Sequence, residues 1–370
     1  MPEVRHSDIS LVVLVGGCAL ISFNMSVRFL RYRVIVSCVL AALVSSALFG
    51  QETSATEKAP STAASQELAQ ARKLVQQGKL DEAIAALQAI DAATKGLAFE
   101  LGTAYYKKSD YPKAIKYLKE ATVEDPLNRE ATQLLGMSYF AGGHPADAIP
   151  ILEKVQGWIP GANVDGSYIL GVCYIQTRNY DQARQSFGKM FDVPSDSAAA
   201  YLFTARMLLR QEFDPVAEEY ALKAASLDPK LPLAHFLLGE LYLYKSRLPE
   251  AIAEFRKELA INPAHAATYY KLADAYSRDQ KFDEAQRLLQ QSIRLDATSS
   301  GPFILMGKVL QKKGDYDLAV LSLKHAVTMD PNNPTAHYLL GQVYRDMGKK
   351  DEAATEMKRA QELHATEDLQ

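Results

Sequence analysis

One pattern constrains this chain more than any other: from about residue 64 onward it repeats itself every 34 residues. Two positions of the repeat carry only small side chains. Position 20 is alanine in all nine copies, namely Ala83, Ala114, Ala148, Ala183, Ala217, Ala251, Ala285, Ala319 and Ala353. Position 8 is Ala71, Gly102, Gly136, Gly171, Ala205, Gly239, Ala273, Gly307 and Gly341. Because two helix backbones approach closely only over small side chains, we expect the two helices of each repeat to cross at these positions.

Other positions complete the unit. Large side chains at positions 11 and 24, such as Tyr242 and Phe255, are expected to fill the space around the crossing. Proline at position 32 ends the second helix, since it lacks the N–H that a continuing helix needs. It occurs in five repeats, as Pro126, Pro160, Pro229, Pro263 and Pro331. Glycine marks the turn between the helices at Gly78, Gly143, Gly314 and Gly348.

This period and pattern resemble the tetratricopeptide-repeat (TPR) family. The repeats are placed at 64–94, 95–128, 129–162, 164–197, 198–231, 232–265, 266–299, 300–333 and 334–367. The resemblance implies an all-α fold, an α-solenoid of about nine antiparallel helix–turn–helix repeats in a right-handed superhelix. Asn163 is an extra residue between two repeats, and we expect the solenoid to bend there.

Two apolar stretches, residues 9–23 and 34–49, precede the repeats. Each is shorter than a membrane span of about 17–25 residues and suits a signal-peptide core of about 7–15. From Met25 onward the order is basic, apolar and then small, as in a secretory signal. The alternative is membrane association through residues 9–49 as a hairpin, with Arg28, Arg31 and Arg33 in the cytoplasmic loop.

Both interpretations predict an exported protein, periplasmic or anchored to the inner membrane with its repeats outside the cytoplasm. Residues 1–50 are therefore interpreted as a signal peptide or membrane anchor, and Met25 as an alternative start. Residues 51–63 have almost no apolar bulk and are interpreted as a flexible linker.

The resemblance also locates a binding surface. In the family the first helix of each repeat lines the concave face through positions 2, 5, 9, 12 and 13, which implies a groove for a partner polypeptide. The residues predicted for this groove are Phe99, Tyr106, Phe140, Tyr168, Leu202, Arg206, Leu209, Phe236, Glu240, Leu243, Tyr244, Tyr270, Asp274, Lys308 and Tyr338. Phe236, Leu243, Tyr244 and Tyr270 are expected to form one continuous patch of anchors.

Two alternatives remain for this face. Its aromatic side chains can instead be repeat consensus that packs between neighbouring helices. Its bases, Arg206, Arg210, Arg278, Lys308, Lys312 and Arg345, can receive acidic groups of a ligand or form a solvated charged face, since Glu240, Asp274 and Asp346 interrupt them. The carboxylate clamp of co-chaperones needs lysine at position 5 together with asparagine at position 9, and this combination is missing. An asparagine ladder at position 9 is missing as well.

Several classes of function are disfavoured. A net charge of −3 argues against a nucleic-acid surface. The histidines are scattered, without H-E-x-x-H or Cys–His pairing, and no glycine-rich phosphate loop precedes a helix. Cys173, at position 10, is expected to be buried against the adjacent repeat and unreactive.

We therefore predict a non-catalytic scaffold that binds a partner polypeptide in a cell-envelope assembly or secretion process. It is expected to use no cofactor, no metal and no small-molecule substrate. The alternative is an oligomerising scaffold or a general holdase without a sequence-specific ligand.

Overall fold

A computed structural model describes residues 62–158, 164–211 and 214–367. The two N-terminal apolar stretches, most of the predicted linker and the extra residue Asn163 lie outside the described residues. The chain divides between Pro160 and Gly161 into two compact units, each of which is described by itself. The predicted bend at Asn163 remains a prediction.

Each unit consists of paired α-helices, and the described residues contain no strand. Unit 1 contains α2 (Thr62–Gln76), α3 (Leu80–Gln88), α4 (Leu97–Lys107), α5 (Tyr111–Glu124), α6 (Arg129–Ala141) and α7 (Pro145–Trp158). Unit 2 begins with α8 (Val164–Gln176), α9 (Tyr180–Met190), α10 (Ala198–Arg210), α11 (Asp214–Leu227), α12 (Ala234–Tyr244) and α13 (Leu248–Ile261). It continues with α14 (Ala266–Arg278), α15 (Phe282–Leu295), α16 (Gly301–Lys313), α17 (Tyr316–Met329), α18 (Pro334–Asp346) and α19 (Lys350–Glu367).

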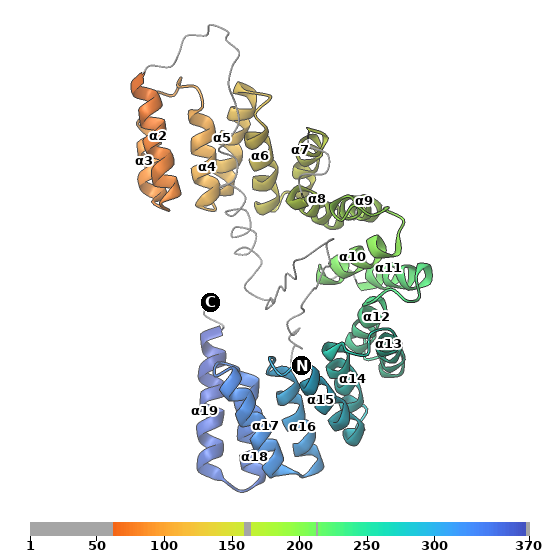
Figure 1. The fold of residues 1–370 in the computed structure, drawn as a ribbon. Coiled ribbons are helices and arrows are strands. Elements are labelled where there is room, and N and C mark those ends of the chain that lie inside the picture. Colours follow the sequence, from red (N-terminus) through yellow and green to blue (C-terminus); the bar gives the residue numbers. More distant parts are fainter. Residues whose placement is uncertain (1–61, 159–163, 212–213, 368–370) are drawn as a thin grey trace. The chain divides into compact units, whose positions relative to one another are not determined.

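Consecutive helices pack as the pairs α2/α3 to α18/α19, so the described residues form nine helix–turn–helix repeats. Figure 1 shows these pairs following one another in chain order within each unit. The predicted all-α solenoid of helix–turn–helix repeats is confirmed. The first helix begins at Thr62, two residues before the predicted start of the first repeat.

The helix crossings lie at the small residues. A Cβ atom added to Gly239 would come within 2.5 Å of the Phe255 ring, and one added to Gly102 would come within 2.6 Å of Leu118 Cγ. Each glycine at position 8 is thus in contact with the large residue at position 24 of its own repeat. The position-20 alanines are all buried. Only small side chains at positions 8 and 20 allow this separation between the helices.

The turn between the two helices requires a left-handed backbone at position 15. The glycines predicted for this turn have positive φ, for example +86° at Gly314. Four repeats place other residues there with φ between 58° and 64°, namely Ser109, Arg178, Ser246 and Gln280. Side chains are strained in this region, so the turn geometry comes from the packing of the two helices rather than from glycine alone.

Side-chain caps mark several helix starts. Asn128 accepts a hydrogen bond from the backbone N–H of Ala131, and Asn333 accepts one from Ala336. Such caps satisfy N–H groups that have no partner within the helix. None of the helices in the described residues is both long and apolar enough to cross a membrane.

Candidate functional site

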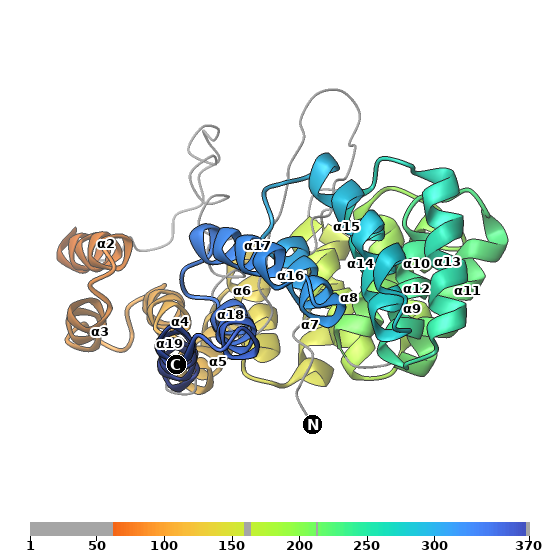
Figure 2. The same cartoon turned by 90° about the horizontal axis from the view of Figure 1, so that it is seen from below.

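The first helices of successive repeats form one layer of unit 2. Contacts join α10 to α12, α12 to α14, α14 to α16 and α16 to α18, while α11 and α13 each contact the first helices on both sides of them. Figures 1 and 2 both show α11 and α13 on the outer side of α10 and α12. We call the surface of the first helices that faces away from the second helices the inner wall. Repeat positions 5 and 9 lie on this wall.

An apolar row runs along the inner wall at position 5. Its members are Tyr168, Leu202, Phe236, Tyr270, Ile304 and Tyr338. Five of them keep part of their surface exposed, and Tyr338 is 48% exposed. Tyr270 is more enclosed than Tyr338, and burial raises the pKa of its hydroxyl to about 12. The row therefore offers apolar surface at the same place in five of six successive repeats.

Phe236 and Leu243 correct the prediction of a continuous anchor patch. Their exposed fractions are only 3% and 5%, so both belong to the core of unit 2. The Phe236 ring packs against Phe255, with centroids 5.9 Å apart, and edge-on against His265, 5.1 Å away. The second helix of the same repeat and the residue that precedes α14 thus cover the position-5 side chain of α12. Tyr244, in contrast, is 58% exposed at the end of the same helix.

The remaining aromatic and apolar residues of the predicted groove are partly buried. In unit 1, Phe99 and Tyr106 pack against the hydrophobic core, and burial raises the pKa of the Tyr106 hydroxyl to about 12. Phe140 and Leu209 are also partly buried. Tyr168 lies 6.5 Å from the Phe187 ring.

Three charged side chains at position 9 form ion pairs, either with the following repeat or within their own helix. Arg72 Nε lies 2.5 Å from a carboxylate oxygen of Glu100, and Lys271 Nζ lies 3.1 Å from Glu240. In both pairs the partner occupies position 6 of the next repeat. Asp274 instead accepts a hydrogen bond of 2.8 Å from Arg278, one turn further along α14. Opposite charges at position 9 and at the next position 6 were the signal in the sequence for these pairs.

Two predicted bases at position 9 have no such partner. Within the described part of the chain, neither Arg206 nor Lys308 makes a hydrogen bond or ion pair through its side chain. Position 6 of the following repeat is Leu237 after Arg206 and Leu339 after Lys308, so the next repeat offers no carboxylate there. Lys308 is exposed, whereas Arg206 is largely enclosed. Burial lowers the pKa of the Arg206 guanidinium, and the nearby Glu240 carboxylate acts against that shift.

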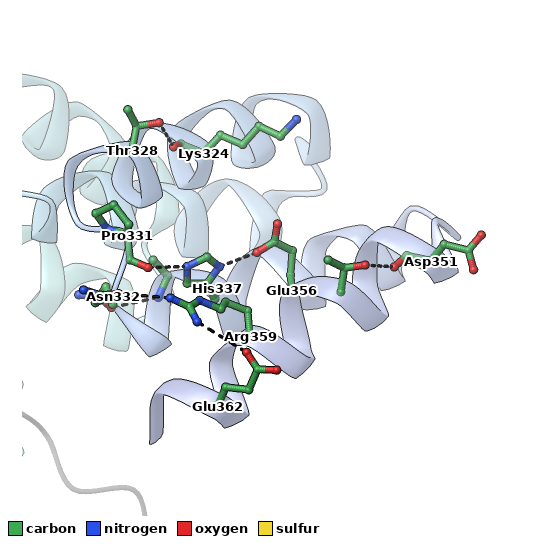
Figure 3. A network of polar contacts seen from close by, with 12 residues as sticks. Lys324, Thr328, Pro331, Asn332, His337, Asp351, Glu356, Arg359 and Glu362 are labelled. Carbon is green, nitrogen blue, oxygen red and sulfur yellow. Dashed lines mark hydrogen bonds and ion pairs between the residues drawn. The ribbon is translucent and has the colours of Figure 1, made fainter. Parts of the chain in front are cut away.

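The histidines at position 4 have structural partners. His235 Nδ1 lies 2.6 Å from Glu254, and His337 Nδ1 lies 2.6 Å from Glu356. Figure 3 shows His337 between Glu356 of α19 and the Pro331 carbonyl, which lies 3.1 Å from Nε2. These pairs join the two helices of one repeat, so both histidines have a structural role. No group of three or more metal-ligating side chains occurs among the described residues.

Cys173 of α8 is fully buried, and it is the one free cysteine of the described residues. Burial raises the pKa of its thiol to about 12. Its predicted burial is confirmed, and a buried thiol with so high a pKa contains almost no thiolate at neutral pH.

Comparison with known proteins gives one human relative and several solved structures. The human intraflagellar transport protein 88 homolog is 25% identical over 190 residues, which are 45% of this chain and 23% of that protein. The chain therefore spans less than a quarter of that relative. MamA from Desulfovibrio magneticus RS-1 is 19% identical, with a TM-score of 0.44 over 47% of this chain and 98% of that chain. YrrB, described as a TPR protein with an unusual peptide-binding site, is 22% identical, with a TM-score of 0.42 over 49% and 93%.

Family models identify the repeats directly. A model described as "Tetratricopeptide repeat" matches residues 99–163, 170–232 and 215–266, and a second model with the same description matches 266–299 and 334–366. A third, described as "TPR repeat", matches residues 307–348. Together with the paired helices and the small residues at each crossing, these matches show that the chain belongs to the tetratricopeptide-repeat family.

Proposed function

We propose that this protein is a non-catalytic scaffold that binds a segment of a partner polypeptide along the inner wall of unit 2. The TPR repeat is generally a non-catalytic protein-interaction unit, and this supports a scaffold. The observation that carries the proposal is the apolar row at position 5, which is apolar in six successive repeats although five of its members are not fully buried.

The row suits an elongated ligand. Successive first helices pack about 8–10 Å apart, and a chain in the polyproline II conformation advances about 3.1 Å per residue with about three residues per turn. A partner side chain would therefore meet a new member of the row about every third residue. Partly enclosed aromatic residues such as Tyr270 and Tyr338 bury much surface with few rotatable bonds, which is why such rings dominate binding energy at interfaces.

The cellular context is proposed from the sequence. A basic segment followed by an apolar stretch and small residues at 25–50 supports export of the repeats. We therefore place the scaffold in a cell-envelope assembly or secretion process, periplasmic or held at the inner membrane by residues 9–49. N-terminal sequencing of the mature protein should begin between Leu48 and Thr53, or the protein should be membrane-bound. A soluble cytoplasmic protein with an intact Met1 would contradict both forms.

Binding is tested by crosslinking the full-length protein in its own cells and identifying stoichiometric partners by mass spectrometry. Tyr338→Ala and Tyr270→Ala should each reduce the recovery of that partner about tenfold or more, because truncation of an anchor costs about 2 kcal/mol. Leu321→Ala is the matched control: Leu321 is 64% exposed but lies on the second helix α17. Circular dichroism checks that each variant remains folded.

The result also separates the scaffold from its alternative. Loss of one partner in the tyrosine variants, with recovery unchanged in Leu321→Ala, supports the proposal. Recovery of many unrelated unfolded clients that is equally affected by all three changes would favour a general holdase. Recovery of the protein's own copies alone would favour an oligomerising scaffold.

A further inference from the structure

The chain contains two arginines at repeat position 9, and one of them shows what this position binds. Arg72 of α2 contacts the carboxylate of Glu100 at 2.5 Å. Glu100 belongs to the next repeat and its side chain is almost completely buried. Burial raises the pKa of Glu100, and the hydrogen bond from Arg72 opposes that shift. At this place in the repeat, therefore, an arginine compensates a glutamate carboxylate that reaches it from an adjacent helix.

Arg206 of α10 occupies the same position but lacks that carboxylate. The residue equivalent to Glu100 is Leu237, which is buried in the core of unit 2. The nearest acid of the inner wall, Glu240, forms an ion pair with Lys271 in which both side chains are largely buried. Arg210 lies close enough to lower the pKa of Arg206, and Arg206 lies close enough to lower the pKa of His265. Neither Arg210 nor His265 can supply a negative charge.

The charges around Arg206 therefore do not balance. One carboxylate, that of Glu240, is shared among the cations Arg206 and Lys271, and it is in contact with Lys271. A partly enclosed guanidinium without an anion loses hydration and gains no ion pair, which is unfavourable unless a ligand supplies the missing charge. Acids that seemed to interrupt the bases along this wall are thus neutralised within the chain, as Glu240 is by Lys271 and Asp274 by Arg278.

We propose that Arg206 binds a carboxylate of the partner polypeptide, which takes the place beside Arg206 that Glu100 takes beside Arg72. The site lies on the inner wall between α10 and α12, next to Leu202 of the apolar row. The ligand segment thus combines an acidic group with neighbouring apolar side chains. This inference rests on the proposed function, because it assigns the chemistry of one contact within the same binding surface.

A defined peptide tests the site. The probe is a fluorescein-labelled, acetylated and amidated peptide of three Glu-Gly-Leu-Ser units, titrated with the protein at about 50 mM salt and followed by fluorescence anisotropy. Arg206→Gln should weaken binding about ten- to hundredfold, as expected for a hydrogen bond between charged groups. Arg206→Lys should restore part of the affinity, since it keeps the charge and loses the two-pronged geometry.

Matched controls come from the probe and from unit 1. A peptide with glutamine in place of glutamate should bind the wild-type protein as weakly as the acidic peptide binds Arg206→Gln. A glutamine peptide with a free C-terminal carboxylate distinguishes a terminal from a side-chain carboxylate. Arg72→Gln changes an arginine at the same repeat position that already has a partner, and it should leave the affinity for the acidic peptide unchanged.

Three results would overturn the inference: no binding of the acidic peptide to the wild-type protein, equal affinity in Arg206→Gln, or an equal loss in Arg72→Gln. The proposed function fails in a different way. If Arg206→Gln still recovers the crosslinked cellular partner while Tyr338→Ala does not, the apolar row binds the partner and Arg206 has no part in it. If neither change affects recovery, the inner wall is not the binding surface.

Discussion

Arg72 in unit 1 and Arg206 in unit 2 occupy the same position of the same repeat, yet only one of them is compensated within the chain. Arg72 contacts Glu100 from the next repeat, whereas the residue at the equivalent place after Arg206 is the buried Leu237. One substitution at position 6 thus changes an internal ion pair into an uncompensated base. The repeat register decides which side chains can meet, and the individual residues decide whether the contact is made inside the chain or left for a ligand.

Position 5 shows the opposite contrast. Phe99 in unit 1 is partly buried at the edge of its core, whereas Phe236 in unit 2 is enclosed by Phe255 and His265. Position 5 is therefore more enclosed at Phe236 than at Phe99, whereas at position 9 the difference lies in the presence of a carboxylate partner. Four predictions, from the largest expected effect to the smallest, test this comparison.

Truncating the two phenylalanines tests position 5. Phe236→Ala should lower the free energy of unfolding by about 3–5 kcal/mol, because it empties a fully packed site. Phe99→Ala should cost about 1–2 kcal/mol, since its ring is only partly removed from water. Urea unfolding followed by circular dichroism measures both. Equal losses would mean that the inner sides of the two units are closed to the same extent.

The helix crossings test what the units share. Gly239→Leu and Gly102→Leu place a side chain where even a Cβ atom would lie 2.5–2.6 Å from the facing residue. Each should cost about 1–3 kcal/mol or more through overpacking, and the loss should be similar in the two units. A stable Gly239→Leu protein would contradict the crossing at position 8.

Removing the arginines tests position 9. Arg72→Gln should destabilise the protein by about 1–3 kcal/mol, because the substitution leaves the buried Glu100 without its ion pair. The loss should lie towards the lower end of this range, because the Arg72 side chain is half exposed. Arg206→Gln should change stability by less than about 1 kcal/mol, because no ion pair is lost. Thermal unfolding of both variants at low salt gives the comparison. A larger loss in Arg206→Gln would reveal an internal partner for Arg206.

Cys173 reports on the opening of unit 2. A thiol reagent should not label it in the native protein at neutral pH. Phe236→Ala should accelerate labelling more than Phe99→Ala, because Phe236 belongs to the same compact unit as Cys173 and Phe99 does not. Burial raises the pKa of the thiol to about 12, whereas an unfolded cysteine ionises near about 8.5. The stability contributed by the neutral thiol should therefore be complete below about pH 8.5 and be lost as the pH rises towards 12. Rapid labelling of the native protein would place Cys173 at the surface.

The sequence by itself determined the repeat. Alanine at position 20, small residues at position 8 and large residues at position 24 predict where two helices cross, since that contact lies within one repeat and recurs in each of them. The register also predicted that positions 5 and 9 share a face of the first helix, because every third or fourth position of a helix shares a face. Four turn positions with positive φ, such as Ser246, are not glycine, so the sequence did not indicate their left-handed backbone.

Burial along the inner wall was decided only by the tertiary structure. Nothing at position 5 of α12 distinguishes Phe236 from Tyr270, yet His265 and Phe255 cover the first ring, whereas the second remains partly exposed. For Glu240 and Asp274 the sequence offered Lys271 and Arg278 as partners of opposite charge, and the structure shows that both ion pairs are formed. Burial depends on how closely neighbouring helices approach, and that distance results from side chains far apart in the sequence rather than from the period of 34 residues.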